Sequence, residues 1–352
     1  MEPPLDFTPR HPLHKILPST CGFRGCKMNE GIYDSGKWER ARVQIIESTQ
    51  RVPVMAGATH VSFLLLGGGG GGGSGKLDLT LATANAGAGG SGAGLQYRRR
   101  MPLRLMQLFK MFAFDVVIGA GGTAGAAQTS SPTNGNPGGT GGSSRIEFQF
   151  LDRGPTQNAQ NSVRLNVSGG GLGAGGTNGF ANATATSNNS GQINGITGGQ
   201  GSALGQQGGH SGNSFGTNPW HWIAPSGGIS GSGAGYNAQN RNPGLHTFYS
   251  AGLSAATQAG NDNGPDAITF AEPVWDFVLS GWKTAPTMEE LAWLTTISGG
   301  CGGNSASSGA GGAGGKGYRG SGGGGGAGAH FTSSGAGGAG GNGVAVFWWE
   351  RL

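Results

Sequence analysis

The chain has 352 residues, of which 78 are glycine, and its formal net charge is +5. Glycine and proline together make up about 27% of it, a content typical of low-complexity or disordered chains, but 8 Trp, 15 Phe and 5 Tyr argue against disorder because disordered segments are poor in aromatic residues. Collagen is excluded, since glycine does not occupy every third position throughout and proline is scarce.

Residues 1–51 differ from the rest in carrying prolines, many charges and no glycine run. They predict an extended arm that gains structure on another surface, an attachment region, with a short strand at residues 41–48. The first ten residues lack a basic segment followed by an apolar one, so we expect no secretory signal. Cys21 and Cys26 are read as a local disulfide or as two buried thiols.

After this arm, one pattern recurs: an apolar, strand-like segment leads directly into glycines. It occurs at residues 61–75, 114–125, 163–176 and 294–303, and in reverse order at 138–150 and 337–350. Glycine loses more backbone freedom on folding than any other residue, so glycine runs anchored at strands indicate ordered packing rather than flexible linkers. The strands predicted from this pattern are residues 60–66, 77–82, 112–118, 145–151 and 344–349.

A basic cluster lies within this first glycine-rich part, at Arg98, Arg99, Arg100 and Arg104, with Lys110 nearby. It predicts a solvated or inter-subunit surface, or alternatively a contact with nucleic acid or anionic lipid. The apolar segment 103–118 contains charged residues and is not a membrane span. From residue 154 to residue 261 the only charges are Arg164 and Arg241, so this part offers no phosphate-binding surface and no nucleic-acid partner is expected.

Two segments match nucleotide-binding motifs. Residues 114–127, FDVVIGAGGTAGAA, resemble a dinucleotide-binding turn, but prolines and glycines follow where that motif needs a helix. Residues 70–76, GGGGSGK, match a phosphate-binding loop, but Leu77 replaces the Ser or Thr that holds magnesium. Neither is read as a site, and we expect no cofactor, no metal and no enzymatic activity.

The part from residue 152 to 298 is rich in asparagine, glycine and aromatic residues. Trp220, His221, Trp222, Tyr236 and Tyr249 form the one candidate binding group, because exposed aromatic rings in a neutral, hydroxyl-rich surface can stack on sugars. The alternative is that Trp220 and Trp222 fill a core. A capping box at residues 287–290 predicts a short helix.

The segment VPVMAGATHVSFLLLGGGGGGGSGK at residues 52–76 resembles the opening of the glycine-rich domain of bacteriophage tail fibre, tail tip and spike proteins. FDVVIGAGGTAG and the ending GGAGGNGVAVFWWE are similar to that family's internal and closing elements. The resemblance implies glycine-rich loops bundled as polyglycine II helices. The predicted fold is therefore mainly β, with β-sandwich-like strands framing such loops, an extended N-terminal arm and little helix.

The expected organisation is a particle-attachment region at residues 1–51, a glycine-rich β domain at 52–151, a receptor-facing expansion at 152–298 and a closing segment at 299–352. The resemblance implies a structural component of the virion, on the tail or particle surface, that contributes to host attachment. Its expected partners are other virion proteins through residues 1–51, a host receptor such as a glycan, and further copies in a homotrimer. The alternatives are a capsid-surface or head-fibre protein and a cellular glycine-rich wall protein.

Overall fold

The structure is a computed structural model, and it describes the β domain and most of its glycine runs. The described residues are 41–79, 84–104, 111–150, 164–177, 309–330 and 332–352, with short stretches at 198, 200, 225, 227–228, 230–231, 263–264, 266, 284–287, 299–300 and 302–303. All of them belong to one compact unit, residues 37–352, and residues 1–36 form another. Residues 1–40 of the predicted N-terminal arm and the predicted helix after residue 287 lie outside the described residues, whereas residues 42–46 and 50–51 of that arm belong to strands of the β domain.

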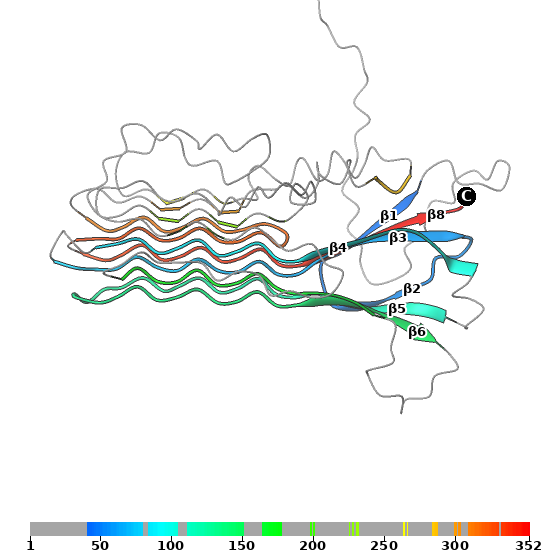
Figure 1. Cartoon of the computed structure of the whole chain (residues 1–352), viewed down its shortest axis with the longest axis horizontal. Coiled ribbons are helices and arrows are strands. Elements are labelled where there is room, and N and C mark those ends of the chain that lie inside the picture. Colours follow the sequence, from blue (N-terminus) through cyan, green and yellow to red (C-terminus); the bar gives the residue numbers. More distant parts are fainter. Residues whose placement is uncertain are drawn as a thin grey trace, which may run out of the picture. The chain divides into compact units, whose positions relative to one another are not determined.

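Two antiparallel four-stranded sheets form the fold, which confirms the prediction of a mainly β chain (Figure 1). The first sheet has the order β1-β8-β3-β4, and the second has the order β2-β5-β6-β7. The strands are β1 Arg42–Ile46, β2 Gln50–Pro53, β3 His60–Leu66, β4 Leu95–Pro102, β5 Met111–Val117, β6 Ser144–Phe150, β7 Arg164–Val167 and β8 Val344–Glu350.

The core lies between the two sheets and is aromatic at its centre. Phe63 packs edge-on against Phe347 of its own sheet, at 4.9 Å between ring centroids, and against Phe114 of the second sheet, at 5.2 Å. These rings and Trp349 are fully buried. Side chains alternate between the faces of a strand, so the apolar residues of β3 at every second position reach this core.

The two outer faces of the sheets differ. On the first sheet, Leu64, Val346 and Trp348 are also fully buried, so that sheet is covered on both sides. On the second, Arg51 of β2 pairs with Asp115 of β5 at 2.6 Å, and this hydrogen bond, followed by the charge attraction, raises the pKa of the Arg51 guanidinium. The outer face of the second sheet is therefore a polar, partly exposed one.

The glycine run that follows β3, residues 67–76, is called the central run. Its amides donate in strict rotation to three other runs: Gly67 to Gly94, Gly68 to Gly142, Gly69 to Gly341, and again Gly70 to Ser91, Gly71 to Gly139, Gly72 to Gly338, at 2.8–3.1 Å. The partner number falls by three at each repeat, so the central run is antiparallel to all three. A period of three residues with hydrogen bonds only between runs is the polyglycine II conformation.

The carbonyl groups of the central run accept hydrogen bonds from three further runs with the same period. Gly170 donates to Gly68, Gly122 to Gly69, and Gly323 to Gly70, and each series continues three residues on. Six runs therefore enclose the central run: residues 84–94, 119–128, 135–143, 168–177, 321–329 and 334–343. They lead away from the strands side by side in Figure 1.

A second run, residues 321–329, is enclosed in the same way. It bonds to the central run, to residues 84–94 and 334–343, and to residues 300–303 and 309–317, and residues 228 and 231 also pack against it. Seven consecutive glycines at 67–73 and five at 322–326 are the two longest uninterrupted glycine runs of the sequence. A Cβ built on any residue from Gly67 to Gly73 would lie 1.9–2.2 Å from a backbone oxygen of a neighbouring run, which explains the uninterrupted glycines there.

The predicted strands at residues 60–66, 112–118, 145–151 and 344–349 correspond to β3, β5, β6 and β8, and the strand expected at 41–48 corresponds to β1. The strand predicted at 77–82 is wrong for its described part. Leu77 makes only isolated bridges to Thr133 and Ala329, because its amide, which donates to the Thr133 carbonyl, continues the period-three bonding of the central run. Strands β2 and β4 were not predicted.

Candidate interaction site

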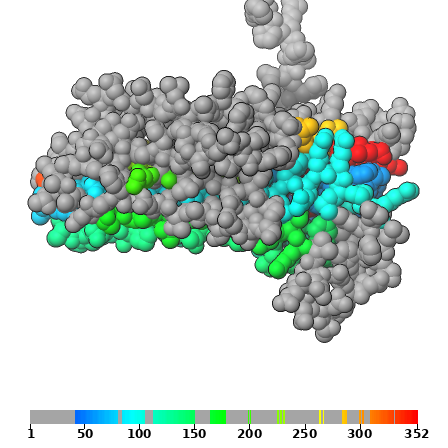
Figure 2. Space-filling view, viewed as in Figure 1, coloured from blue at the N-terminus to red at the C-terminus, as the bar shows by residue number. Residues whose placement is uncertain are grey.

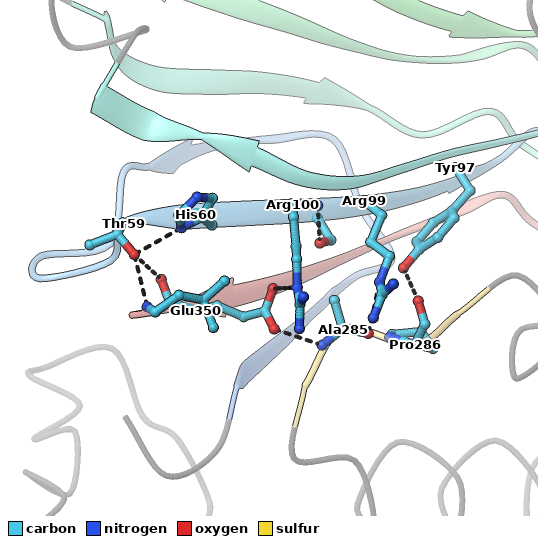
Figure 3. Close-up of polar contacts among 10 residues, drawn as sticks. Thr59, His60, Tyr97, Arg99, Arg100, Ala285, Pro286 and Glu350 are labelled. Carbon is cyan, nitrogen blue, oxygen red and sulfur yellow. Dashed lines mark hydrogen bonds and ion pairs between the residues drawn. The ribbon is translucent and has the colours of Figure 1, made fainter. Parts of the chain in front are cut away.

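A polar cluster on the outer face of the first sheet is the most elaborate side-chain arrangement among the described residues (Figure 3). It consists of Tyr97, Arg99 and Arg100 of β4 and Glu350 of β8, and is called the β4–β8 clasp. Strand β4 carries a bulge opposite β3, where the pairing shifts between Val61 and Phe63. A bulge redirects side chains, so consecutive arginines can serve the same face of the sheet.

Arg100 marks the strained point of this bulge. Its φ is +50°, in the left-handed region that a side chain other than glycine rarely adopts. Two contacts hold it there: its amide donates to Ser62 Oγ at 2.8 Å, and its guanidinium Nε lies 3.5 Å from Glu350 Oε2. Strained backbone of this kind persists only where the surroundings fix it, and such positions cluster at functional sites.

The clasp holds the segment 284–287 by its main chain. Tyr97 Oη donates to the Pro286 carbonyl at 2.5 Å, and Arg99 Nε donates to the Ala285 carbonyl at 3.3 Å. The Ala285 amide donates to Glu350 Oε1 at 3.1 Å. Ala285 is fully buried. These three hydrogen bonds are all to backbone atoms of residues 285 and 286, so they hold the chain without depending on its side chains.

Glu350 is itself locked in place at the end of β8. Thr59 donates to the Glu350 carbonyl from its amide, at 2.8 Å, and from its Oγ1, at 3.3 Å. Thr59 Oγ1 in turn accepts from the Leu352 amide at 3.0 Å. Tyr97 stacks edge-on against Trp348 at 6.1 Å between ring centroids. The arrangement is suited to binding and positioning a peptide segment.

A second polar group lies where the central run ends, away from the sheets. Lys76 forms a buried ion pair with Asp78 at 2.5 Å, and the Asp78 carbonyl lies 3.0 Å from His330 Nδ1. The Leu79 amide donates to Ser131 Oγ at 3.1 Å, while the Leu79 side chain is 60% exposed. This end therefore combines a rigid polar base with one exposed apolar side chain.

The two nucleotide-like motifs are both parts of the bundle. Each amide from Gly70 to Lys76 donates to a carbonyl of another run, so the amides that would cradle a phosphate are already committed. Residues 119–125 follow β5 as a run whose Gly122 and Gly125 amides bond to the central run, without the helix that a dinucleotide site requires. The sequence-based rejection of both motifs agrees with this geometry.

The candidate receptor residues Trp220, His221, Trp222, Tyr236 and Tyr249 lie outside the described residues, as do Lys110 and all three cysteines. The arginines of the basic cluster are described. All four lie on or just after β4 and are exposed: Arg98, Arg99, Arg100 and Arg104. Figure 2 shows cyan atoms of this part of the chain on the molecular surface near the sheets. Arg99 and Arg100 reach the clasp, so part of the cluster has a structural role.

Tyr97 and Glu350 were missed by reasoning from the sequence. A usable signal existed for Glu350, because it is the single charged residue of the otherwise apolar strand VAVFWWE, and a charge there needs a partner. In the described ranges, no group of three or more His, Cys, Asp and Glu side chains could hold a metal ion.

The sequence model of a glycine-rich domain family matches residues 46–350. That range begins at the last residue of β1 and ends at the last residue of β8, so it covers strands β2 to β8 and every described glycine run. No curated protein matches the chain. Among the described residues, no helix is long and apolar enough to cross a membrane.

Proposed function

Because the chain belongs to the glycine-rich domain family, we propose that it is a virion structural protein, a component of a phage tail fibre, tail tip or spike that contributes to host attachment. The specific support is the resemblance of residues 52–76, 114–125 and 337–350 to the glycine-rich domain of such proteins. The described residues add a physical reason, which is the construction of the bundle.

The observation that carries the proposal is the enclosure of the central run by six others. Neighbouring runs are linked by a hydrogen bond at every third residue, about every 9 Å along the axis for this conformation. A bundle cross-linked in this way resists bending and shear. Rigidity without a large hydrophobic core is what a slender protruding module needs.

The roles within the proposal follow the division of the chain. Residues 1–36, a separate unit, lie at the start of the predicted attachment region. The aromatic residues between 220 and 249 are the candidate receptor contacts. The β4–β8 clasp fastens residues 284–287, close to the end of that inserted part, to the first sheet, and so ties the insertion to the rigid body.

Labelling of intact particles with a gold-conjugated antibody against this protein is the direct test. Label on the tail fibre, tip or spike supports the proposal. Label on the capsid supports a head-fibre protein instead. Label on the cell envelope with none on particles contradicts a virion role and supports a cellular wall protein.

Two further variants separate attachment from receptor binding. Deletion of residues 2–36 leaves β1 intact, so the protein should fold yet fail to join particles. Normal incorporation would refute the assignment of that region.

Trp220→Ala with Trp222→Ala should reduce adsorption of particles to cells without lowering the melting temperature. A large fall in melting temperature would instead place both residues in a core. Thr140→Ala on the exposed side of the bundle is the matched control.

A further inference from the structure

We propose that the side of the bundle formed by residues 119–128 and 135–143 is built to exclude a further polyglycine run, so that the bundle of one copy does not continue into a second copy. These two runs are called the outer pair. They form the lower side of the bundle in Figures 1 and 2, where their green atoms are exposed. The inference concerns the bundle itself and does not depend on the function proposed above.

The outer pair is an open edge of the hydrogen-bonded packing. Gly122 and Gly125 turn their amides inward to the central run. Ala120 and Thr123, which lie two residues before these glycines, are exposed, and so is Thr140 of the neighbouring run. The amides of these three residues donate no hydrogen bond within the described part of the chain. Unpaired backbone groups at a regular repeat are a template for further pairing, as at the edge of a β-sheet.

The natural occupant of such an edge is a glycine run of a second copy. It carries amides and carbonyls at the same three-residue repeat, and it has no Cβ to hold it away. Two copies could meet through the same outer pair related by a two-fold axis, the commonest way in which identical chains associate. Such contact requires that nothing project between the runs.

The packing distance between runs leaves no room for a single carbon. A Cβ built on Gly68 would lie 2.0 Å from the Ala120 carbonyl oxygen, and one built on Gly71 would lie 1.9 Å from that of Thr123. Both oxygens belong to backbone and not to a movable side chain. A Cβ that points toward a neighbouring position therefore keeps any run from occupying it.

The outer pair places a side chain at every third position, facing solvent. In the first run these are Ala120, Thr123 and Ala126, and in the second they are Pro137, Thr140 and Ser143, and all six are exposed. By the distance argument, their β-carbons hold an additional run beyond hydrogen-bonding range.

One further feature closes the same face independently of these small side chains. Pro137 lacks an amide hydrogen, so it removes one donor from the edge, as edge-strand prolines do. Asn136 Nδ2 donates to the Ala126 carbonyl at 2.9 Å, which extends the series of bonds from Gly142 to Ala120 and from Gly139 to Thr123 that joins the two runs to each other. The small side chains and the proline act on one face, which is why we infer exclusion and not merely tolerance of side chains.

The test is to open the face and measure association. In the opened variant, Ala120→Gly, Thr123→Gly and Ala126→Gly remove the three β-carbons of one run. In the matched control, Ala120→Ser, Thr123→Ser and Ala126→Ser keep every β-carbon but change the surface chemistry. Light scattering and sedimentation velocity over a hundredfold range of concentration give the mass of each protein.

We expect the opened variant to shift, with rising concentration, to twice the mass of the wild-type species, whereas the wild type and the serine control keep one mass. An opened variant that folds and keeps the wild-type mass throughout would overturn the inference, and so would equal association of the serine control. If the opened variant does not fold, the variant Thr123→Gly with Thr140→Gly decides by the same criteria.

Discussion

Replacement of Gly71 by alanine is the sharpest perturbation of the central run. Its amide donates to the Gly139 carbonyl and its carbonyl accepts from the Gly173 amide, each at 2.9 Å. The new methyl group would lie 1.9 Å from the Thr123 carbonyl oxygen and 2.7 Å from its carbon. Contacts this short do not exist, so the run containing Thr123 must move away by about 1 Å or more.

That movement has an estimable effect on stability. It weakens the two hydrogen bonds of residue 71 and the bond from Gly139 to the Thr123 carbonyl, at about 1 kcal/mol each. Overpacking adds about 1–3 kcal/mol. Alanine has less conformational freedom than glycine in the unfolded chain, and this raises the free energy of unfolding by about 0.4–1 kcal/mol. The net loss is about 3–5 kcal/mol, a large part of the stability of a typical domain.

Differential scanning calorimetry should show this as a fall in melting temperature of about 10 °C. Thr140→Ala, a change of similar size on the exposed side of the bundle, should alter the free energy of unfolding by no more than about 0.5 kcal/mol. If both variants melt together with the wild type, the runs are not packed at the distances described, and the reasoning fails.

The second enclosed run should behave like the first. In Gly323→Ala the new Cβ would lie 2.1 Å from the Gly338 carbonyl oxygen, so the variant should lose about 3–5 kcal/mol of stability in denaturant unfolding. An effect below about 1 kcal/mol would argue that only the central run is enclosed. Ser74→Ala should lower the free energy of unfolding by about 1 kcal/mol, because Ser74 Oγ accepts from the Asn136 amide at 2.8 Å. Ser74→Thr keeps the hydroxyl but adds a methyl group to a buried site, so it should lower the free energy of unfolding by more. Glu350→Gln should speed proteolysis near residues 284–287 while leaving the sheets folded, since it removes the charge facing Arg100, and unchanged cleavage would show that the clasp does not hold that segment.

The sheets were largely predictable because their strands end where the glycines begin. In β3 and β8 the apolar residues leave no other assignment, and the glycines on one side fix the boundary. Strand β4 was missed because Arg98, Arg99 and Arg100 interrupt the alternation of apolar and polar residues that identifies a strand. The bulge and the left-handed Arg100 accommodate that interruption, and neither has a sequence signature of its own.

The arrangement of the glycine runs was only partly predictable. Their conformation followed from their composition, but which run lies beside which is a tertiary property, fixed by the order of the strands to which each run is attached. A local rule does emerge: uninterrupted glycines mark enclosed runs, and a small side chain at every third position marks an outer one. The clasp could not be predicted, because Tyr97, Ala285 and Glu350 are far apart in sequence.

Amide hydrogen exchange tests the central claim, that the glycine runs are ordered by hydrogen bonds between them, most directly. The amides of Gly67–Gly75 should exchange as slowly as those of β3 and β8, because each donates to a carbonyl of a neighbouring run, whereas the outward amides of Thr123 and Thr140 should exchange quickly. Exchange of the Gly67–Gly75 amides at the rate of an unstructured peptide, while the sheets remain protected, would contradict the account.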